Sequence, residues 1–156
     1  LGNLFIGYNE NRSLQTGSHN LVVGTGHQFS SYGGVLFGRG NRISEHSASI
    51  LGGVNHHVKA EGGVIVGGKT HTVDELRGVV LGGANHQVHG AYGVVVGGQS
   101  NTVNSGDAVI VGGNRNTTEG LRDIVVGGEF NISTHDSNVL LGGQNATSSA
   151  DFEVAP

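Results

Sequence analysis

The sequence contains no cysteine, tryptophan or methionine, and its single proline is the last residue, Pro156. Without cysteine, the chain can form neither disulfide bonds nor thiolate metal sites. No apolar stretch approaches the ~20 residues of a membrane-spanning helix, so we expect no membrane contact within this chain. No run of Lys or Arg occurs and the net charge is −4, which argues against a nucleic-acid-binding protein.

Aromatic residues are also scarce, at 5% of the chain, whereas 30 of the 156 residues are glycine. An ordinary globular domain uses far less glycine. Low aromatic content with many Val, Ile and Leu residues indicates a thin structure whose interior is too narrow for large rings. Leu1 is not an initiator methionine, so we interpret the sequence as a fragment or a processed chain, with any signal or anchor outside it.

A short phrase recurs along the chain, and its clearest copy is Gly-Val-Val-Val-Gly-Gly at residues 93–98. The first residue of the apolar triplet falls at 49, 64, 79, 94, 109, 124 and 139, a constant step of 15. Three less regular copies begin at Leu4, Leu21 and Val35. Fixed spacing with recurring glycine is typical of stacked coils, and we count about ten of them.

The pattern within one coil predicts an all-β, single-domain parallel β-solenoid with 14–15 residues per coil. The triplet forms a strand, Gly-Gly turns the chain because glycine adopts positive φ without steric cost, and a second short strand follows, as at residues 101–103. The absence of a 3.6-residue period predicts essentially no helix. We assign residues 1–148 to the repeat domain, with less regular coils over 1–48 and regular coils over 49–145, and residues 149–156 to a C-terminal linker.

The central residue of each triplet is expected to point away from the coil interior, because neighbouring side chains in a strand alternate between faces. Such a stripe of large apolar residues is too extensive to leave in water. A ring of identical chains would cover it evenly, and three copies form the smallest ring that encloses an axis. The predicted oligomer interface is the row Phe5, Val22, Leu36, Ile50, Ile65, Val80, Val95, Ile110, Val125 and Leu140.

A polar row lies two residues before the apolar position of each second strand: His27, Asn41, His56, His71, His86, Asn101, Asn116 and Asn131. We favour a structural turn ladder, because Asn tolerates left-handed backbone angles and its amide can bond to the next coil, with His as a less common substitute. The alternative is a metal or anion site at His56, His71 and His86, since imidazole binds metals and imidazolium binds anions. No carboxylate or cysteine shares the row, so we predict no bound metal and no cofactor.

Catalytic residue patterns are missing. Ser18 and His19 place a hydroxyl beside an imidazole, but adjacency in sequence does not make a catalytic triad. The glycines at 24–26 resemble part of a phosphate-binding loop but open no helix, so the amide cradle for a phosphate is absent. We therefore predict that the chain is not an enzyme.

The triplet, the following glycine and the Asn-rich turn resemble the head repeats of YadA-type trimeric autotransporter adhesins, which repeat a motif close to Asn-Ser-Val-Ala-Ile-Gly. Residues 107–112 and 136–142 are the nearest copies, and the resemblance covers residues 1 to about 148. It implies a left-handed parallel β-roll wound as a homotrimer on a bacterial surface fibre. Similar repeats also occur in phage fibres. The central triplet residue, small in that family, is mostly Val, Ile or Leu here.

The resemblance implies a structural and adhesive module, extracellular on a bacterial cell surface or a phage particle, whose outward turns contact a host matrix protein or a surface glycan. One alternative is a filament building block that stacks head to tail through open coil ends. Another is an ice-binding solenoid, which needs a flat array of threonines. Thr72, Thr102, Thr117 and Thr147 share one position, but His57, Gln87 and Ile132 interrupt that array.

Overall fold

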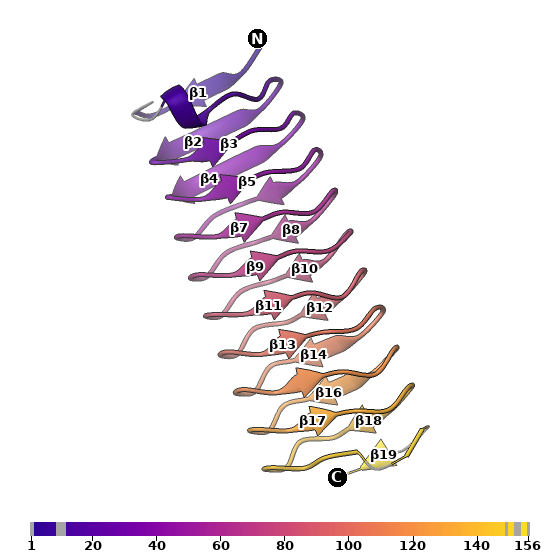
Figure 1. The fold of residues 1–156 in the computed structure, drawn as a ribbon. Helices are drawn as coiled ribbons and strands as arrows, with labels where there is room; N and C mark the ends of the chain where they lie inside the picture. The colour runs from indigo at the N-terminus through magenta and orange to yellow at the C-terminus, as the bar shows by residue number, and fades with distance from the viewer. Residues whose placement is uncertain (1, 9–11, 149, 152–153, 156) are drawn as a thin grey trace.

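The computed structural model describes residues 2–8, 12–148, 150–151 and 154–155. Over these residues the chain winds into a parallel β-solenoid whose coils stack from the N-terminus to the C-terminus (Figure 1). A long sheet of eleven strands and a short sheet of eight strands run along the stack. Within the described residues, the one helical element is the 3₁₀ turn η1 (Arg12–Leu14). The predicted all-β solenoid is thereby confirmed.

The strands are short, with two to five residues each. The long sheet contains β1 (Leu4–Ile6), β2 (Leu21–Thr25), β4 (Val35–Arg39), β6 (Ser49–Ile50), β8 (Val64–Ile65), β10 (Val79–Val80), β12 (Val94–Val95), β14 (Val109–Val111), β16 (Ile124–Val126), β18 (Val139–Leu140) and β19 (Val154–Ala155). The short sheet contains β3 (Gln28–Phe29), β5 (Arg42–Ile43), β7 (His57–Val58), β9 (Thr72–Val73), β11 (Gln87–Val88), β13 (Thr102–Val103), β15 (Thr117–Thr118) and β17 (Ile132–Ser133).

Each strand pairs in parallel with the corresponding strand of the next coil. Val80 of β10, for example, is in register with Ile65 of β8 and Val95 of β12. Ten strands of the long sheet, β1 to β18, correspond to the ten apolar triplets, so nine turns separate them. A third line of single-residue bridges runs between the sheets through Arg39, Val54, Lys69, Ala84, Gln99, Asn114, Glu129 and Gln144.

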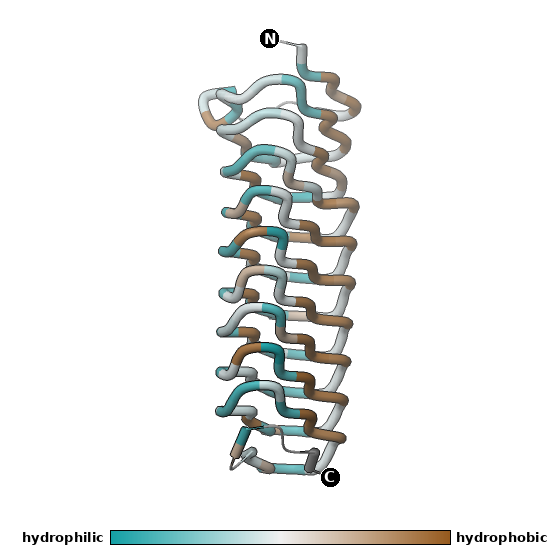
Figure 2. The backbone as a smooth tube through the Cα atoms, turned by 90° about the vertical axis from the view of Figure 1, so that its right-hand side faces the viewer, coloured by the Kyte–Doolittle hydropathy of each residue, from teal (hydrophilic) through white to brown (hydrophobic). Residues whose placement is uncertain are grey.

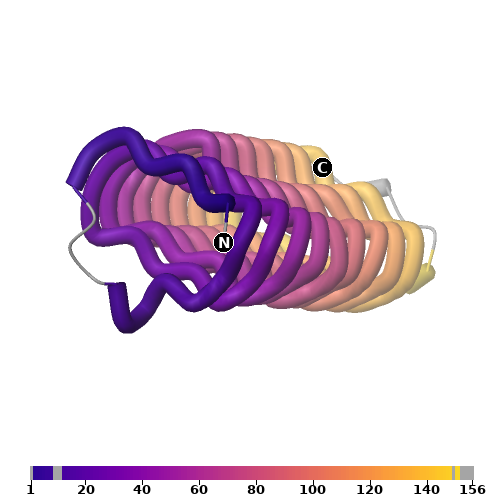
Figure 3. The backbone as a smooth tube through the Cα atoms, turned by 90° about the horizontal axis from the view of Figure 1, so that it is seen from above, coloured from indigo at the N-terminus to yellow at the C-terminus, as the bar shows by residue number. Residues whose placement is uncertain are grey.

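The core is a narrow column between the two sheets, and successive coils overlap closely when the stack is viewed along its axis (Figure 3). In the coil of residues 78–92, the buried residues are Gly78, Val80, His86, Val88 and Gly90. The two sheets thus contribute one large apolar side chain each, from the second residue of β10 and of β11. This thin interior explains why the chain needs so few aromatic residues.

The row predicted to face outward faces inward instead. Phe5 is half-buried against the core, Val22 is 4% exposed, and the other eight central residues are fully buried: Leu36, Ile50, Ile65, Val80, Val95, Ile110, Val125 and Leu140. The predicted interface row is therefore the core of the solenoid. The side chains that point outward are those on either side of each central residue, such as Val94 and Val96.

Crowding within the coil decides this orientation. Two residues before the central position, the chain carries Gly63, Gly78 and Gly93, which also face inward. A Cβ atom at Gly78 would lie 2.8 Å from Cγ1 of both Val73 and Val88 on the short sheet. Bulk on one sheet therefore requires glycine on the other. The small residue at this position is the sequence signal that could have fixed the orientation.

Both ends of the stack depart from the regular coil. At the N-terminus, Gln15 next to η1 bridges Phe29 of β3 and donates its side-chain amide to the backbone carbonyl of His27 at 3.0 Å. At the C-terminus, the region expected to be a linker adds β19 to the long sheet, with Val154 in register with Val139. Val154 also continues the 15-residue step. Because β19 pairs with β18, the linker prediction is wrong for residues 154–155. Residues 149, 152–153 and 156 lie outside the described residues.

Candidate functional site

The outer surface of the long sheet is almost entirely apolar. Nineteen of its twenty outward positions are apolar and the other is Ser49, so we call this surface the apolar face: residues 4, 6, 21, 23, 35, 37, 49, 51, 64, 66, 79, 81, 94, 96, 109, 111, 124, 126, 139 and 141. Figure 2 shows apolar segments recurring in every coil along the rod. Leu51, Leu81 and Leu141 are 46%, 46% and 55% exposed. The face carries no charged side chain that would solvate it.

The outer surface of the short sheet is polar over most of its length. We call it the polar face: Gln28, Arg42, His57, Thr72, Gln87, Thr102, Thr117 and Ile132, with the neighbouring outward residues Ser44, Lys59, Asp74, His89, Asn104, Glu119 and Thr134. The three threonines of the predicted ice-binding array that lie in short-sheet strands belong to this face, and Gln87 and Ile132 interrupt the array.

An ion-pair cluster spans three coils of the polar face. The carboxylate of Asp74 contacts Lys59 Nζ at 2.9 Å and His89 Nδ1 at 2.8 Å. Nearby, Ser44 Oγ and His57 Nε2 lie 3.0 Å apart. Burial, reinforced by the charges of Arg42 and Lys59, lowers the pKa of His57 to about 4. An imidazole with so low a pKa is a poor general base near neutral pH, so the Ser44–His57 contact does not form an activated nucleophile.

The row of eight His and Asn residues forms a hydrogen-bonded ladder inside the coils. All eight side chains are buried, with at most 1% exposed. Each accepts the backbone N–H of the ladder residue in the next coil: His71 N–H donates to His56 Nδ1 at 3.0 Å, and Asn116 N–H donates to Asn101 Oδ1 at 2.9 Å. The last bond, from Ala146 N–H to Asn131 Oδ1 at 2.9 Å, follows the same rule. These bonds satisfy buried backbone N–H groups that would otherwise lack an acceptor.

The Asn and His members of the ladder differ on their donor side. Asn101 Nδ2 donates to the carbonyls of Gly112 and Gly113, both at 3.1 Å. The corresponding Nε2 atoms of His56, His71 and His86 form no well-aligned hydrogen bond among the described residues, although neighbouring glycine carbonyls still favour the protonated rings. The imidazole rings stack instead, with centroids 4.8 Å apart for His56–His71 and 4.9 Å for His71–His86.

Burial lowers the pKa of all four ladder histidines. Desolvation is the main cause in each case, and it brings the pKa of His56 and His71 from 6.5 to about 4. The stacked neighbours His56 and His86 lower the pKa of His71 further, because like charges repel. Nearby glycine carbonyls oppose these shifts without reversing them. The rings are therefore neutral at pH 7, with the proton on Nε2, because Nδ1 accepts a backbone N–H.

Left-handed backbone angles occur one residue before the ladder, not at it. Asn55, Asn85 and Arg115 have φ between 53° and 58°. We predicted that Asn occupies the ladder partly because it tolerates positive φ, and that part of the prediction is wrong. The ladder composition is explained by hydrogen bonding to the next coil. A second left-handed position closes each coil, and there the guanidinium of Arg77 lies 6.0 Å above the ring of Tyr92.

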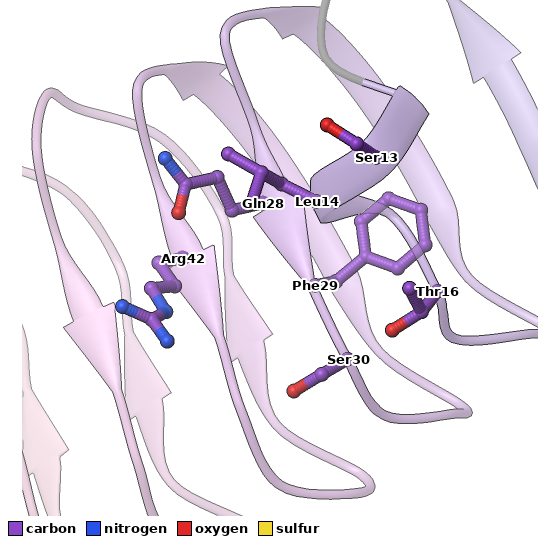
Figure 4. A pocket seen from close by; sticks show the side chains of 7 residues that line it. All are labelled: Ser13, Leu14, Thr16, Gln28, Phe29, Ser30 and Arg42. Atoms are coloured by element: carbon purple, nitrogen blue, oxygen red, sulfur yellow. The ribbon is translucent and has the colours of Figure 1, made fainter.

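A small cleft of about 150 Å³ opens beside the N-terminal 3₁₀ turn (Figure 4). It lies where η1 meets β3 and β5, and Phe29 at its base is only 1% exposed. Its lining residues are Ser13, Leu14, Thr16, Gln28, Phe29, Ser30 and Arg42. It holds room for only a small group, and no described acid–base pair faces into it.

No group of three or more His, Asp or Glu residues among the described residues is arranged to hold a metal ion. The stacked histidines also use their Nδ1 atoms inside the ladder. The described residues likewise form no helix long and apolar enough to cross a membrane. Comparison of the chain with protein-family models, curated proteins and solved structures finds no match.

Proposed function

We propose that the protein is a structural repeat module, a rigid rod whose copies associate through the apolar face. The observation that carries the proposal is the unbroken apolar surface, nineteen of twenty positions, on a fold that does not need it for its own core. The polar face, by contrast, carries side chains that water can solvate. Nothing within the described chain covers the apolar face.

The size of the apolar face supports association. Nine steps of ~4.8 Å give a length of about 43 Å, and two side-chain columns give a width of about 13 Å. The resulting ~550 Å² is at the upper end of what a monomer exposes and approaches the ~800 Å² per partner of a standard interface. A flat stripe of this kind fits a closed ring of three copies, as the resemblance to trimeric adhesin heads implies.

In this proposal the rod belongs to an extracellular fibre of a bacterial surface or a phage particle, and the polar face stays free to contact a host matrix protein or a glycan. The turns at the coil edges add Arg77 beside Tyr92 and Arg115 beside Phe130, at 6.0 and 5.2 Å. Such arginine–aromatic pairs are suited to binding surfaces.

Sedimentation velocity at micromolar concentration tests the association. We expect the wild-type chain to sediment as a trimer and the variant Leu81→Asp/Val96→Asp/Val111→Asp to sediment as a folded monomer. The matched control is Gln87→Asp/Thr102→Asp/Thr117→Asp on the polar face, which should stay trimeric. A stable wild-type monomer would overturn the proposal. Fibres seen by electron microscopy would instead favour head-to-tail stacking through the coil ends.

A further inference from the structure

The middle of the ladder combines three features that the rest of it lacks. His56, His71 and His86 occupy consecutive coils, stack ring on ring, and leave each Nε2 without a well-aligned hydrogen-bond partner among the described residues. Asn41 and Asn101 flank this run and donate their amides to backbone carbonyls. The same backbone position thus carries two kinds of side chain, and of the two only imidazole can take up a proton in mild acid.

Protonation is incompatible with the ladder bond. Each Nδ1 accepts a backbone N–H from the next coil, at 3.0 Å for His56 and 3.1 Å for both His71 and His86. An imidazolium carries hydrogen on both nitrogens and accepts no bond. Its Nδ1–H would point at the backbone N–H that it now binds. Adding a proton therefore removes the bond and places a buried charge in the coil.

Among the described residues, no counter-charge faces the stack to offset that cost. The turns packed against it, residues 51–55, 66–70, 81–85 and 96–100, contain one charged residue, the exposed Lys69. The short-sheet strands β7, β9 and β11 direct Val58, Val73 and Val88 inward. Their charged or titratable residues, His57 and the Lys59–Asp74–His89 cluster, belong to the polar face.

We propose that the stacked histidines make the coils of residues 53–98 an acid-labile section of the rod. The ladder bonds of this section hold at neutral pH and break in mild acid, so that the section opens. The inference concerns the solenoid itself and holds whether or not copies associate. This section can open locally because each coil of a solenoid contacts only its neighbours. Opening one stretch therefore need not unfold the whole stack.

The direction of the pH effect follows from linkage. The pKa of His56 and His71 is about 4 when folded and about 6.5 when exposed, so between these values the open coil binds more protons than the closed one. Stability is complete above pH ~6.5, falls as the pH drops, and levels off below pH ~4. At pH 4 each such histidine lowers the ratio of closed to open coils by about 100-fold.

Hydrogen exchange read by mass spectrometry tests the inference, with rates corrected for intrinsic exchange at each pH. Backbone amides of residues 53–98 should lose at least about 100-fold of their protection between pH 7 and pH 4. The variant His56→Asn/His71→Asn/His86→Asn, which uses the residue already present at Asn101, should lose much less of it, because only one histidine with a lowered pKa remains there, His57, whose pKa is also about 4 in the folded coil. His57→Asn, which removes the neighbouring outward histidine, should still open in acid.

Two results would overturn the inference: wild-type protection over residues 53–98 that survives at pH 4, or equal loss in the wild type and the triple variant. If the triple variant does not fold, the reciprocal variant Asn101→His/Asn116→His provides an independent test. It should extend the acid-labile section to residues 101–128, and protection there equal to that of the wild type at pH 4 would contradict the inference.

Discussion

Val96 of the long sheet and Thr102 of the short sheet both point outward from the same coil, only six residues apart in sequence. One belongs to a continuous apolar face and the other to a polar face with threonines, glutamines and ion pairs. Both sheets share one period, one register rule and one interior. The inside of this solenoid therefore determines folding, whereas the two outer surfaces are free to differ in polarity.

The inner surfaces of the two sheets also differ along the rod. The short sheet buries Val88 and Val103 in its middle and Thr118 and Ser133 near its C-terminal end. The inward residue just before the next long-sheet strand is Gly93 after Val88 and Ala108 after Val103, so a small residue faces each valine. Where the short sheet carries Thr118 and Ser133, the long sheet accommodates Asp123 and Asn138, both fully buried. Asp123 then accepts the backbone N–H of Asn138 at 3.0 Å.

The largest loss of stability is expected from placing a charge on the inner side of a long-sheet strand, compared with the same charge on its outer side. Val95→Asp places a carboxylate in the dry core without a partner, which costs more than ~4 kcal/mol and should prevent folding of the central coils. Val96→Asp, one residue later, should leave the circular dichroism spectrum largely intact and lower the melting temperature far less, by no more than the loss of association between copies. Similar melting of the two variants would show that the strand does not distinguish its faces.

A smaller loss is expected from bulk added between the sheets. A Cβ atom at Gly93 would lie 2.7 Å from Val103 Cγ1, so Gly93→Ala should destabilise the fold by ~1–3 kcal/mol, as overpacked cores do. Gly67→Ala is the control, because a Cβ atom there meets nothing within 4 Å. Chemical denaturation should separate the two, and an unchanged midpoint for Gly93→Ala would contradict the packing argument.

Thr118→Val should stabilise the chain. The Thr118 hydroxyl is buried and has no hydrogen-bond partner among the described residues, and the short sheet already carries Val103 at the equivalent position one coil earlier. Removing an unsatisfied hydroxyl at constant shape should gain ~1 kcal/mol, measured as a higher denaturation midpoint. Ser133→Val is not an equivalent test, since that hydroxyl lies 3.5 Å from Ser148 Oγ. A lower midpoint for Thr118→Val would indicate a bound water at this site.

The smallest effect is expected on the polar face. Asp74→Asn removes the charge that joins Lys59 and His89, but the contacts are partly solvated, and such pairs contribute ~0–1 kcal/mol. The melting temperature should therefore change little at neutral pH, and the change should shrink further at high salt. A loss as large as that from Gly93→Ala would mean that the polar face contributes substantially to folding.

Much of the fold was predictable because the repeat is local. The step of 15, the Gly-Gly turns and the absence of a helical period are sufficient to predict a β-solenoid of about ten coils. The ladder row was also visible, since His71 and Asn101 recur at one position. Its bonding was not, because the acceptor atom and its donor lie in different coils.

The orientation of the triplets was not predictable from alternation alone. In Val94-Val95-Val96 both possible sets of side chains are apolar, so hydrophobicity does not choose between them. The choice depends on Gly93 meeting Val88 and Val103 of the other sheet, a contact that only the assembled coil creates. The final strand was missed because Val154 keeps the 15-residue step but the apolar triplet and the Gly-Gly turn do not recur there, so that only the pairing with β18 reveals it.

The period, the class of fold and the positions of the polar row can be read from the amino-acid sequence, because each depends on residues within one coil length. Which side of each strand faces the core, which surface remains apolar, and which histidines lie in contact are set by the packing of the folded coils. Those outcomes depend on the volume between two sheets and on stacking across coils, where residues 15 apart in sequence become nearest neighbours.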